Sequence, residues 1–323
     1  MSEPFEEYND IEDIAEDLTD ADPSVRQVAV MNLADSADEA AIPYLAKALE
    51  DASAEVRKQS ALALGEFDGP AASAALAFAV VDGDSNVAAA AAESLAELKD
   101  PAAADPLFPL VENESAFVRK SVLRALKELR RTEALKPALA ALGDEDADVR
   151  VQAVGVVGFL QMEESLPALK SAAGDRNPQV RRAAISALGF SKATPAGEAL
   201  VMALSDEDWM VREMAAETLG KSQIDIGEPE LIALLGDDYW QVRLKATRTL
   251  GKMGSTKAVA DIGPFLGHDQ SNLRKEAAAA LGEIADPAAL PFLTPYADDP
   301  DPDVRKNVRW AIERIGGDRE AAG

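Results

Sequence analysis

The side chains that most often carry enzyme chemistry are scarce in this sequence. His268 is the one histidine in 323 residues, and there is no cysteine. Disulfides, thiolate nucleophiles and cysteine-ligated zinc are therefore excluded, and an isolated histidine cannot complete a nucleophilic triad. No phosphate-binding loop of the P-loop form occurs. Carboxylates abound, but no pair among the 58 acidic residues stands out for acid–base work. We expect no catalytic, cofactor or metal site, and no enzyme.

Composition and charge narrow the remaining classes. The formal net charge is −26, which repels nucleic acid and anionic membranes at long range. An acidic surface of this kind is typical of proteins from a halophile with a salty cytoplasm; the alternative is a specifically cationic partner. The N-terminus, Met1 to Asp10, lacks a signal-peptide pattern, and no 18-residue apolar run is present. We expect a cytoplasmic protein with no membrane segment.

The elements that position any site follow from an internal repeat. A Val-Arg pair recurs every 31 residues without insertions, Leu273-Arg274 is a variant of it, and Val87-Ala88 fills the remaining place. We call this place the arginine slot and number other positions from it. Ten copies in register indicate a repeat architecture. The arginines are Arg26, Arg57, Arg119, Arg150, Arg181, Arg212, Arg243, Arg274 and Arg305.

Each copy predicts a helical hairpin. Slots −1, +3, +7 and +10 are mostly apolar and fall on one arc of a helix, which we call the second helix. Slot +7 carries a large aliphatic residue in every copy, from Leu33 to Ile312, and six copies have glycine at slot +8. That glycine favours close backbone approach or helix termination. A first helix precedes, with apolar residues eight and twelve positions before the slot, and short Asp/Gly/Pro links join the two.

The phrase Asp-x-x-x-Arg, as in Asp22 to Arg26, followed by Ala-x-x-x-Leu-Gly, resembles HEAT-like repeats. More narrowly it resembles the short type named after phycobilisome lyases, over residues 10 to 315 or so. The resemblance implies an all-α, right-handed α-solenoid of ten hairpins in a single domain, 1–323, with frayed ends at 1–9 and 317–323. It also implies second helices that line a concave groove.

In this family the aspartate and the arginine form a ladder between neighbouring repeats, so we interpret the nine slot arginines as structural. Departures at Ala88, where the arginine is missing, and at Ser53, Tyr239 and Gln270, where the acid is replaced, weaken the ladder locally. His268 falls in a link between helices, where we expect a solvated side chain.

Charge is divided unevenly between the helices. Over eleven residues from each slot, the second helices hold 22 of the 32 basic residues but only 10 of the 58 acidic ones. The predicted groove is thus near neutral or basic on an acidic body. Apolar residues also occupy polar slots of the middle repeats, and tryptophan and methionine beside arginine or lysine are typical of binding hot spots.

We therefore expect a groove across repeats five to eight that binds an acidic, partly apolar segment of another protein. The alternative is that these side chains only pack between repeats. The predicted partner-binding residues are Val151, Phe159, Arg182, Phe190, Trp209, Met210, Met214, Lys221, Trp240, Leu244, Lys245, Arg248 and Lys252.

Three other functions occur on similar repeats. The deoxyhypusine hydroxylase family needs several His-Glu pairs as iron ligands, which one histidine cannot supply. HEAT-like DNA glycosylases use a basic groove with aromatics, which Trp209, Trp240 and Arg243 mimic in part, but the net charge opposes phosphate binding. Bilin-lyase-like activity is suggested by the repeat type alone. We expect a non-enzymatic scaffold or adaptor, with the lyase-like and nucleic-acid-binding functions as alternatives.

Overall fold

The computed structural model describes residues 11–222, 224 and 226–321, and all of its regular structure is helical. The helices group into two compact units, residues 1–160 and 161–323. The expected N-terminal end, 1–9, lies outside the described residues. Of the expected C-terminal end, 317–323, residues 322–323 also lie outside them, whereas the last helix continues to Ala321. No described helix is both long and apolar enough to cross a bilayer.

The first unit contains five hairpins. Its α-helices are α1 (Ile11–Glu16), α2 (Pro23–Asp35), α3 (Ile42–Ala48), α4 (Ala54–Leu64), α5 (Pro70–Ala79), α6 (Ser85–Glu97), α7 (Ala116–Leu129), α8 (Leu135–Ala141) and α9 (Ala147–Leu160). The 3-10 segments are η1 (Asp17–Thr19), η2 (Glu39–Ala41), η3 (Pro101–Glu112) and η4 (Thr132–Ala134). The first helix of the fourth hairpin is entirely 3-10, because Pro106 and Pro109 cannot donate the hydrogen bonds of an α-helix.

The second unit repeats the same order. It contains α10 (Leu166–Ala172), α11 (Pro178–Leu188), α12 (Thr194–Ala203), α13 (Trp209–Ser222), α14 (Glu228–Ala233), α15 (Trp240–Lys252), α16 (Val259–Ile262), α17 (Ser271–Ile284), α18 (Leu290–Leu293) and α19 (Pro302–Ala321). Its 3-10 segments are η5 (Glu163–Ser165), η6 (Leu234–Gly236), η7 (Thr256–Ala258), η8 (Gly263–Gly267), η9 (Pro287–Ala289) and η10 (Thr294–Tyr296).

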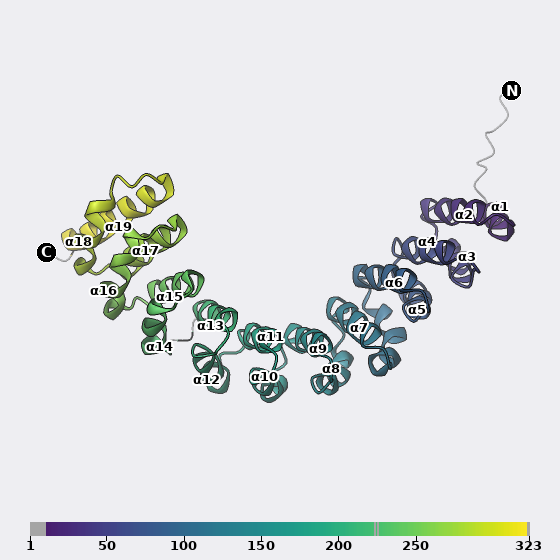
Figure 1. Cartoon of the computed structure of the whole chain (residues 1–323), viewed down its shortest axis with the longest axis horizontal. Helices are drawn as coiled ribbons and strands as arrows, with labels where there is room; N and C mark the ends of the chain where they lie inside the picture. The colour runs from purple at the N-terminus through teal and green to yellow at the C-terminus, as the bar shows by residue number, and fades with distance from the viewer. Residues whose placement is uncertain (1–10, 223, 225, 322–323) are drawn as a thin grey trace, which may run out of the picture. The chain divides into compact units, whose positions relative to one another are not determined.

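Within each unit the second helices of successive repeats pack side by side: α2 packs on α4 and α4 on α6, and α13 packs on α15, α15 on α17 and α17 on α19 (Figure 1). This is the predicted stack of hairpins. Nine of the ten residues at slot +7 are at most 2% exposed, from Leu33 to Leu281. Ile312, in α19, is half-buried, and no further repeat among the described residues covers it. Since a single hairpin cannot bury this stripe, the core of each unit is built by stacking.

Candidate functional site

The slot arginines connect neighbouring repeats. Every one of the nine donates from Nη1 to the carbonyl oxygen six residues earlier, at 2.6–3.0 Å. In six described cases the arginine also donates from Nε and Nη2 to the two carboxylate oxygens of an aspartate 25 residues later. The distance from Nε to Oδ2 is 2.6–2.9 Å. The six pairs are Arg26–Asp51, Arg57–Asp82, Arg119–Asp144, Arg181–Asp206, Arg212–Asp237 and Arg274–Asp299.

The ladder aspartate is not the one that the motif suggested. The partner lies at slot −6 of the next repeat, whereas the acid of Asp-x-x-x-Arg, at slot −4, caps the second helix: Asp22 accepts from the Ser24 N–H at 2.8 Å. The substitutions at Ser53, Tyr239 and Gln270 therefore change a cap, and the arginines that follow Ser53 and Gln270 keep their ladder pairs. Arg57, in the repeat that carries Ser53, still pairs with Asp82.

The ladder departs from its pattern at two other places. Ala88, which replaces the arginine, is followed at the partner slot by Asn113, so both charges are missing together. The second place corrects the prediction for His268. Its side chain is half-buried, with Nε2 3.0 Å from Arg243 Nη2 and Nδ1 accepting from the Gln270 N–H at 3.0 Å. His268 thus occupies an aspartate's place in the ladder and is not a solvated link residue.

The predicted partner-binding residues fall in both units. Val151 and Phe159 belong to the first, where the Arg130 guanidinium lies 4.7 Å from the centre of the Phe159 ring. The other eleven belong to the second. Arg182, Lys221 and Lys252 are exposed, as is Phe159. The half-buried residues are Val151, Phe190, Trp209, Met210, Met214, Trp240, Leu244, Lys245 and Arg248.

In the second unit these residues form two groups at opposite ends of the second helices. Trp209 and Trp240 open α13 and α15, and the Trp209 ring stacks on Tyr239, with centroids 5.0 Å apart and 10° between planes. Lys221 and Lys252 lie twelve residues further along the same helices, a distance of about 18 Å. Met214, Leu244, Lys245 and Arg248 lie between the two groups.

Several of the predicted cations already have partners within the protein. Glu217 of α13 contacts Lys221 Nζ at 2.6 Å and Lys245 Nζ, on α15, at 2.7 Å. Hydrogen bonds from Lys221 and then Lys245 lower the pKa of Glu217 to about 2. Arg248 likewise pairs with Glu276 of α17. Lys245 and Arg248 therefore brace neighbouring repeats, and Lys221 is the more exposed of the two lysines on Glu217.

A cavity of 830 Å³ lies at the C-terminal ends of α13, α15 and α17, beside α19. Its charged residues are Lys221, Lys252 and Arg314 against Glu283, and burial raises the pKa of Glu283, with repulsion from Glu276 adding to the effect. The full lining is Leu219, Gly220, Lys221, Ile224, Gly251, Lys252, Met253, Gly254, Glu283 and Arg314. A cavity with three cations and apolar walls can hold carboxylates attached to an apolar segment.

One apolar surface, on α2 and α4, was not predicted from the sequence. Val28, Met31 and Leu62 of α2 and α4 are 54%, 49% and 37% exposed. They occupy slots +2 and +5 of the first two repeats, and large apolar residues outside the core slots of a second helix are the signal that the sequence carries for this surface.

Comparison with known proteins identifies the repeat. Residues 11–82, 73–145, 135–220 and 228–313 match the HEAT repeats family, which covers most of the chain. A search of curated protein sequences found no significant match. An engineered protein of known structure is 22% identical, with a TM-score of 0.52 over 95% of this chain and 99% of its own.

Two larger solved structures also share the fold. One is Kap95p, from a study of how its binding switches the loops of RanGDP: it is 17% identical with a TM-score of 0.62, over 95% of this chain and 50% of that one. The other is Kap121p bound to Pho4p, 14% identical with a TM-score of 0.64, over 95% of this chain and 41% of that one. The chain thus spans half or less of these two proteins, and the likeness concerns the fold alone.

Proposed function

The chain belongs to the HEAT-repeat family, and from that premise we propose that it is a non-enzymatic scaffold whose second unit binds an acidic, partly apolar segment of a protein partner. HEAT-repeat solenoids are typically used for protein binding, and the Kap95p and Kap121p structures concern such complexes. In a repeat protein the recurring slots build the stack, which leaves the irregular exposed slots free to meet a partner.

The observation that carries this proposal is the cavity at the ends of α13, α15 and α17. Lys221, Lys252 and Arg314 line it on a chain whose net charge is −26. An acidic segment is repelled by most of the surface and attracted here, so the charge distribution favours one place for it. The nucleic-acid alternative uses the same cations, but three of them on so acidic a body give little phosphate affinity.

The half-buried apolar residues supply the second part of the proposed surface. Each is partly exposed: Phe190 just after the end of α11, Met214 on α13 and Leu244 on α15. The stacked Trp209 and Tyr239 rings lie at the entrance of α13 and α15. Aromatic and methionine side chains next to cations are the residues that contribute most to binding in protein interfaces.

The finer assignments belong to the same proposal. We assign the repeats to the short phycobilisome-lyase type on their 31-residue length, and we place the protein in the salty cytoplasm of a halophile on its acidic surface. At high salt, surface ion pairs are screened, so the partner's apolar residues supply a larger share of the affinity.

Binding of a synthetic helical peptide made of glutamate and leucine, measured by fluorescence anisotropy, tests the proposal. The triple variant Lys221→Gln/Lys252→Gln/Arg314→Gln removes the cavity's cations, and we expect its affinity to fall about tenfold. The matched control Lys47→Gln/Lys136→Gln/Lys192→Gln removes three exposed lysines elsewhere, and we expect a change of less than about twofold.

Equal losses in the two variants mean that the peptide responds to net charge alone, and they would exclude the cavity as the binding site. A short oligonucleotide of the same charge serves as competitor. If it displaces the peptide at similar concentration, the nucleic-acid alternative replaces the protein-binding one.

A further inference from the structure

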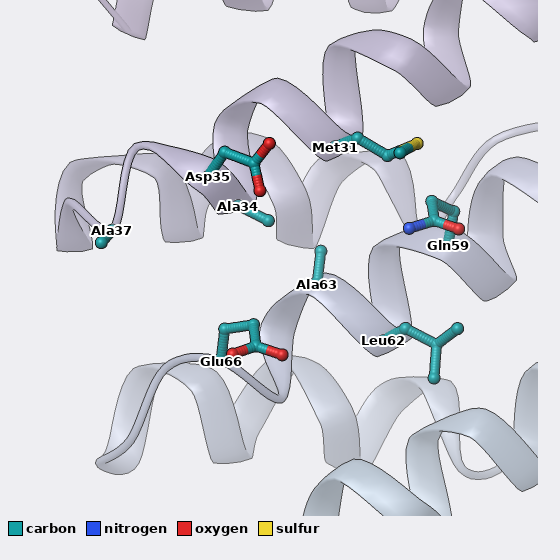
Figure 2. A pocket seen from close by; sticks show the side chains of 8 residues that line it. All are labelled: Met31, Ala34, Asp35, Ala37, Gln59, Leu62, Ala63 and Glu66. Atoms are coloured by element: carbon teal, nitrogen blue, oxygen red, sulfur yellow. The ribbon is translucent and has the colours of Figure 1, made fainter.

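The first unit has a groove of its own on the face of its second helices. One cavity of 450 Å³ lies between α2 and α4, and a second of 520 Å³ lies between α4, α6 and α7. Leu62 and Glu66 line both, so the two form one continuous groove. Figure 2 shows the α2–α4 part, with Met31 and Gln59 near one end and Asp35 and Glu66 near the other.

The groove has an apolar part that no described segment covers. Met31 and Leu62 are 49% and 37% exposed, and Val28, one turn before Met31 on α2, is 54% exposed. Three large apolar side chains on adjacent helices form a patch, whereas single exposed apolar residues are common on any surface.

All but one of its charged residues are acidic, and these acids are unpaired. Asp35, Glu66, Glu93 and Glu97 are all exposed, and none forms an ion pair or a side-chain hydrogen bond with a described residue. One cation, Arg124, lines the α7 end. On α13 and α17, by contrast, Glu217 and Glu276 pair with basic side chains on the neighbouring helix. The groove carboxylates therefore do not serve the stack.

The geometry points to a basic amphipathic helix as the occupant of this groove, and we propose it as a second docking surface of the protein. Asp35, Glu66 and Glu97 occupy slot +9 of successive repeats, so they recur at the spacing of packed helices, about 10 Å. Residues i and i+7 of a helix are about 10.5 Å apart on one face. A ligand with lysine or arginine every seven residues therefore meets one carboxylate per repeat.

The apolar residues of such a helix, three or four positions from each cation, cover Val28, Met31 and Leu62. This surface is separate from the one proposed for the second unit and has the opposite charge. The two proposals are independent, since each concerns residues of one unit.

The probe is a synthetic 18-residue amphipathic helix with lysine at every seventh position and leucine three or four residues from each lysine. Fluorescence anisotropy with the whole chain is the readout. We expect the variant Glu66→Gln/Glu97→Gln to bind it about tenfold more weakly. The control Glu39→Gln/Glu50→Gln removes the same charge from exposed positions of the same unit, and its affinity should stay within about twofold.

The apolar contribution is tested with Met31→Ser/Leu62→Ser, for which we expect a similar loss that persists at 1 M salt, with an unchanged circular dichroism spectrum. A scrambled peptide of the same composition should bind weakly to the unaltered protein. Equal weakening by groove and control variants, or equal binding of the scrambled peptide, shows non-specific attraction to an acidic protein and overturns the proposal.

Discussion

His268 shows how one residue changes a rung of the ladder. An aspartate at this slot accepts from Nε and Nη2 of the preceding arginine and from its own loop N–H, as Asp237 does with Arg212 and Tyr239. A neutral imidazole has one acceptor nitrogen, yet donors approach both nitrogens of His268. The remaining donor, Arg243 Nε, is buried without a hydrogen-bond partner among the described residues.

We therefore expect His268→Asp to stabilise the protein by about 1 kcal/mol, because it satisfies Arg243 Nε and restores a charge-assisted pair. Urea unfolding followed by circular dichroism measures it. Asn113→Asp is the matched control: it places the same carboxylate at the same slot, but Ala88 offers no arginine, so no gain is expected. A comparable gain in both variants would mean that loop capping, and not the ladder, is responsible.

At the scale of the helices, the glycine of slot +8 marks where neighbouring second helices approach most closely. A Cβ on Gly251 would lie 2.7 Å from the Ala280 Cα on α17, and one on Gly220 would lie 2.4 Å from Thr249 Oγ1. Thr249 also donates to the Ala216 carbonyl at 2.7 Å, which is possible only at such short range. The sequence predicted close approach or helix termination, and the structure shows both, since Gly65 and Gly189 end their helices.

We expect Gly251→Ala to destabilise the protein by about 1–2 kcal/mol: the clash with backbone on α17 outweighs the better helix propensity of alanine. Gly236→Ala is the control, because nothing lies within 4 Å of its added Cβ and its φ is ordinary. Thermal unfolding of both variants measures the difference. Stabilisation by Gly251→Ala would show that α15 and α17 separate without cost.

The elements were predictable because a 31-residue period places every core residue in register, as the burial of Leu33 to Leu281 shows. Contacts between repeats were harder to predict, because the spacing within one repeat does not show which of its slots faces the next repeat. Slot −4 gave the familiar motif, whereas slot −6 carries aspartate in eight of ten repeats and is the true partner. The regular recurrence of aspartate at slot −6 was the feature of the sequence that could have identified the partner. The 3-10 form of η3 followed from two prolines that the repeat pattern does not consider.

For the whole molecule, the total charge of the second helices hides an uneven distribution of charge along the chain. Slot +9 is acidic in the first four repeats, Asp35 to Glu128, then phenylalanine in two, and mostly basic from Lys221 onward. This change of charge along slot +9 can be read from the sequence, but the cavities that these residues line depend on how the helices pack. Likewise, the ion pairs of Lys245 with Glu217 and of Arg248 with Glu276 depend on packing between neighbouring helices and could not be predicted from one repeat.

The same charge governs stability against pH and salt. Hydrogen bonds from their arginines hold the pKa of Asp51, Asp82 and Asp144 below the ordinary range. Because the pKa is lowered in the folded state, each carboxylate stabilises the fold above its unfolded pKa, near 4, and this contribution is lost as pH falls through the folded value. Self-repulsion acts the other way: it is strong at pH 7 and vanishes near the isoelectric point of 4.4.

We therefore expect the melting temperature at low salt to be highest near pH 4.5 and to fall on either side. At pH 7, 1 M sodium chloride should raise it by screening the repulsion among 58 acidic residues, whereas near pH 4.5 salt should have little effect. Asp82→Asn separates the two causes. It removes one rung, so its melting temperature should lie below that of the unaltered protein at pH 7, and the difference should shrink as the pH falls through the lowered pKa of folded Asp82. A difference that does not shrink as the pH falls would mean that Asp82 acts through its loop hydrogen bonds. A fall in melting temperature with salt at pH 7 would mean that ion pairs outweigh the net repulsion.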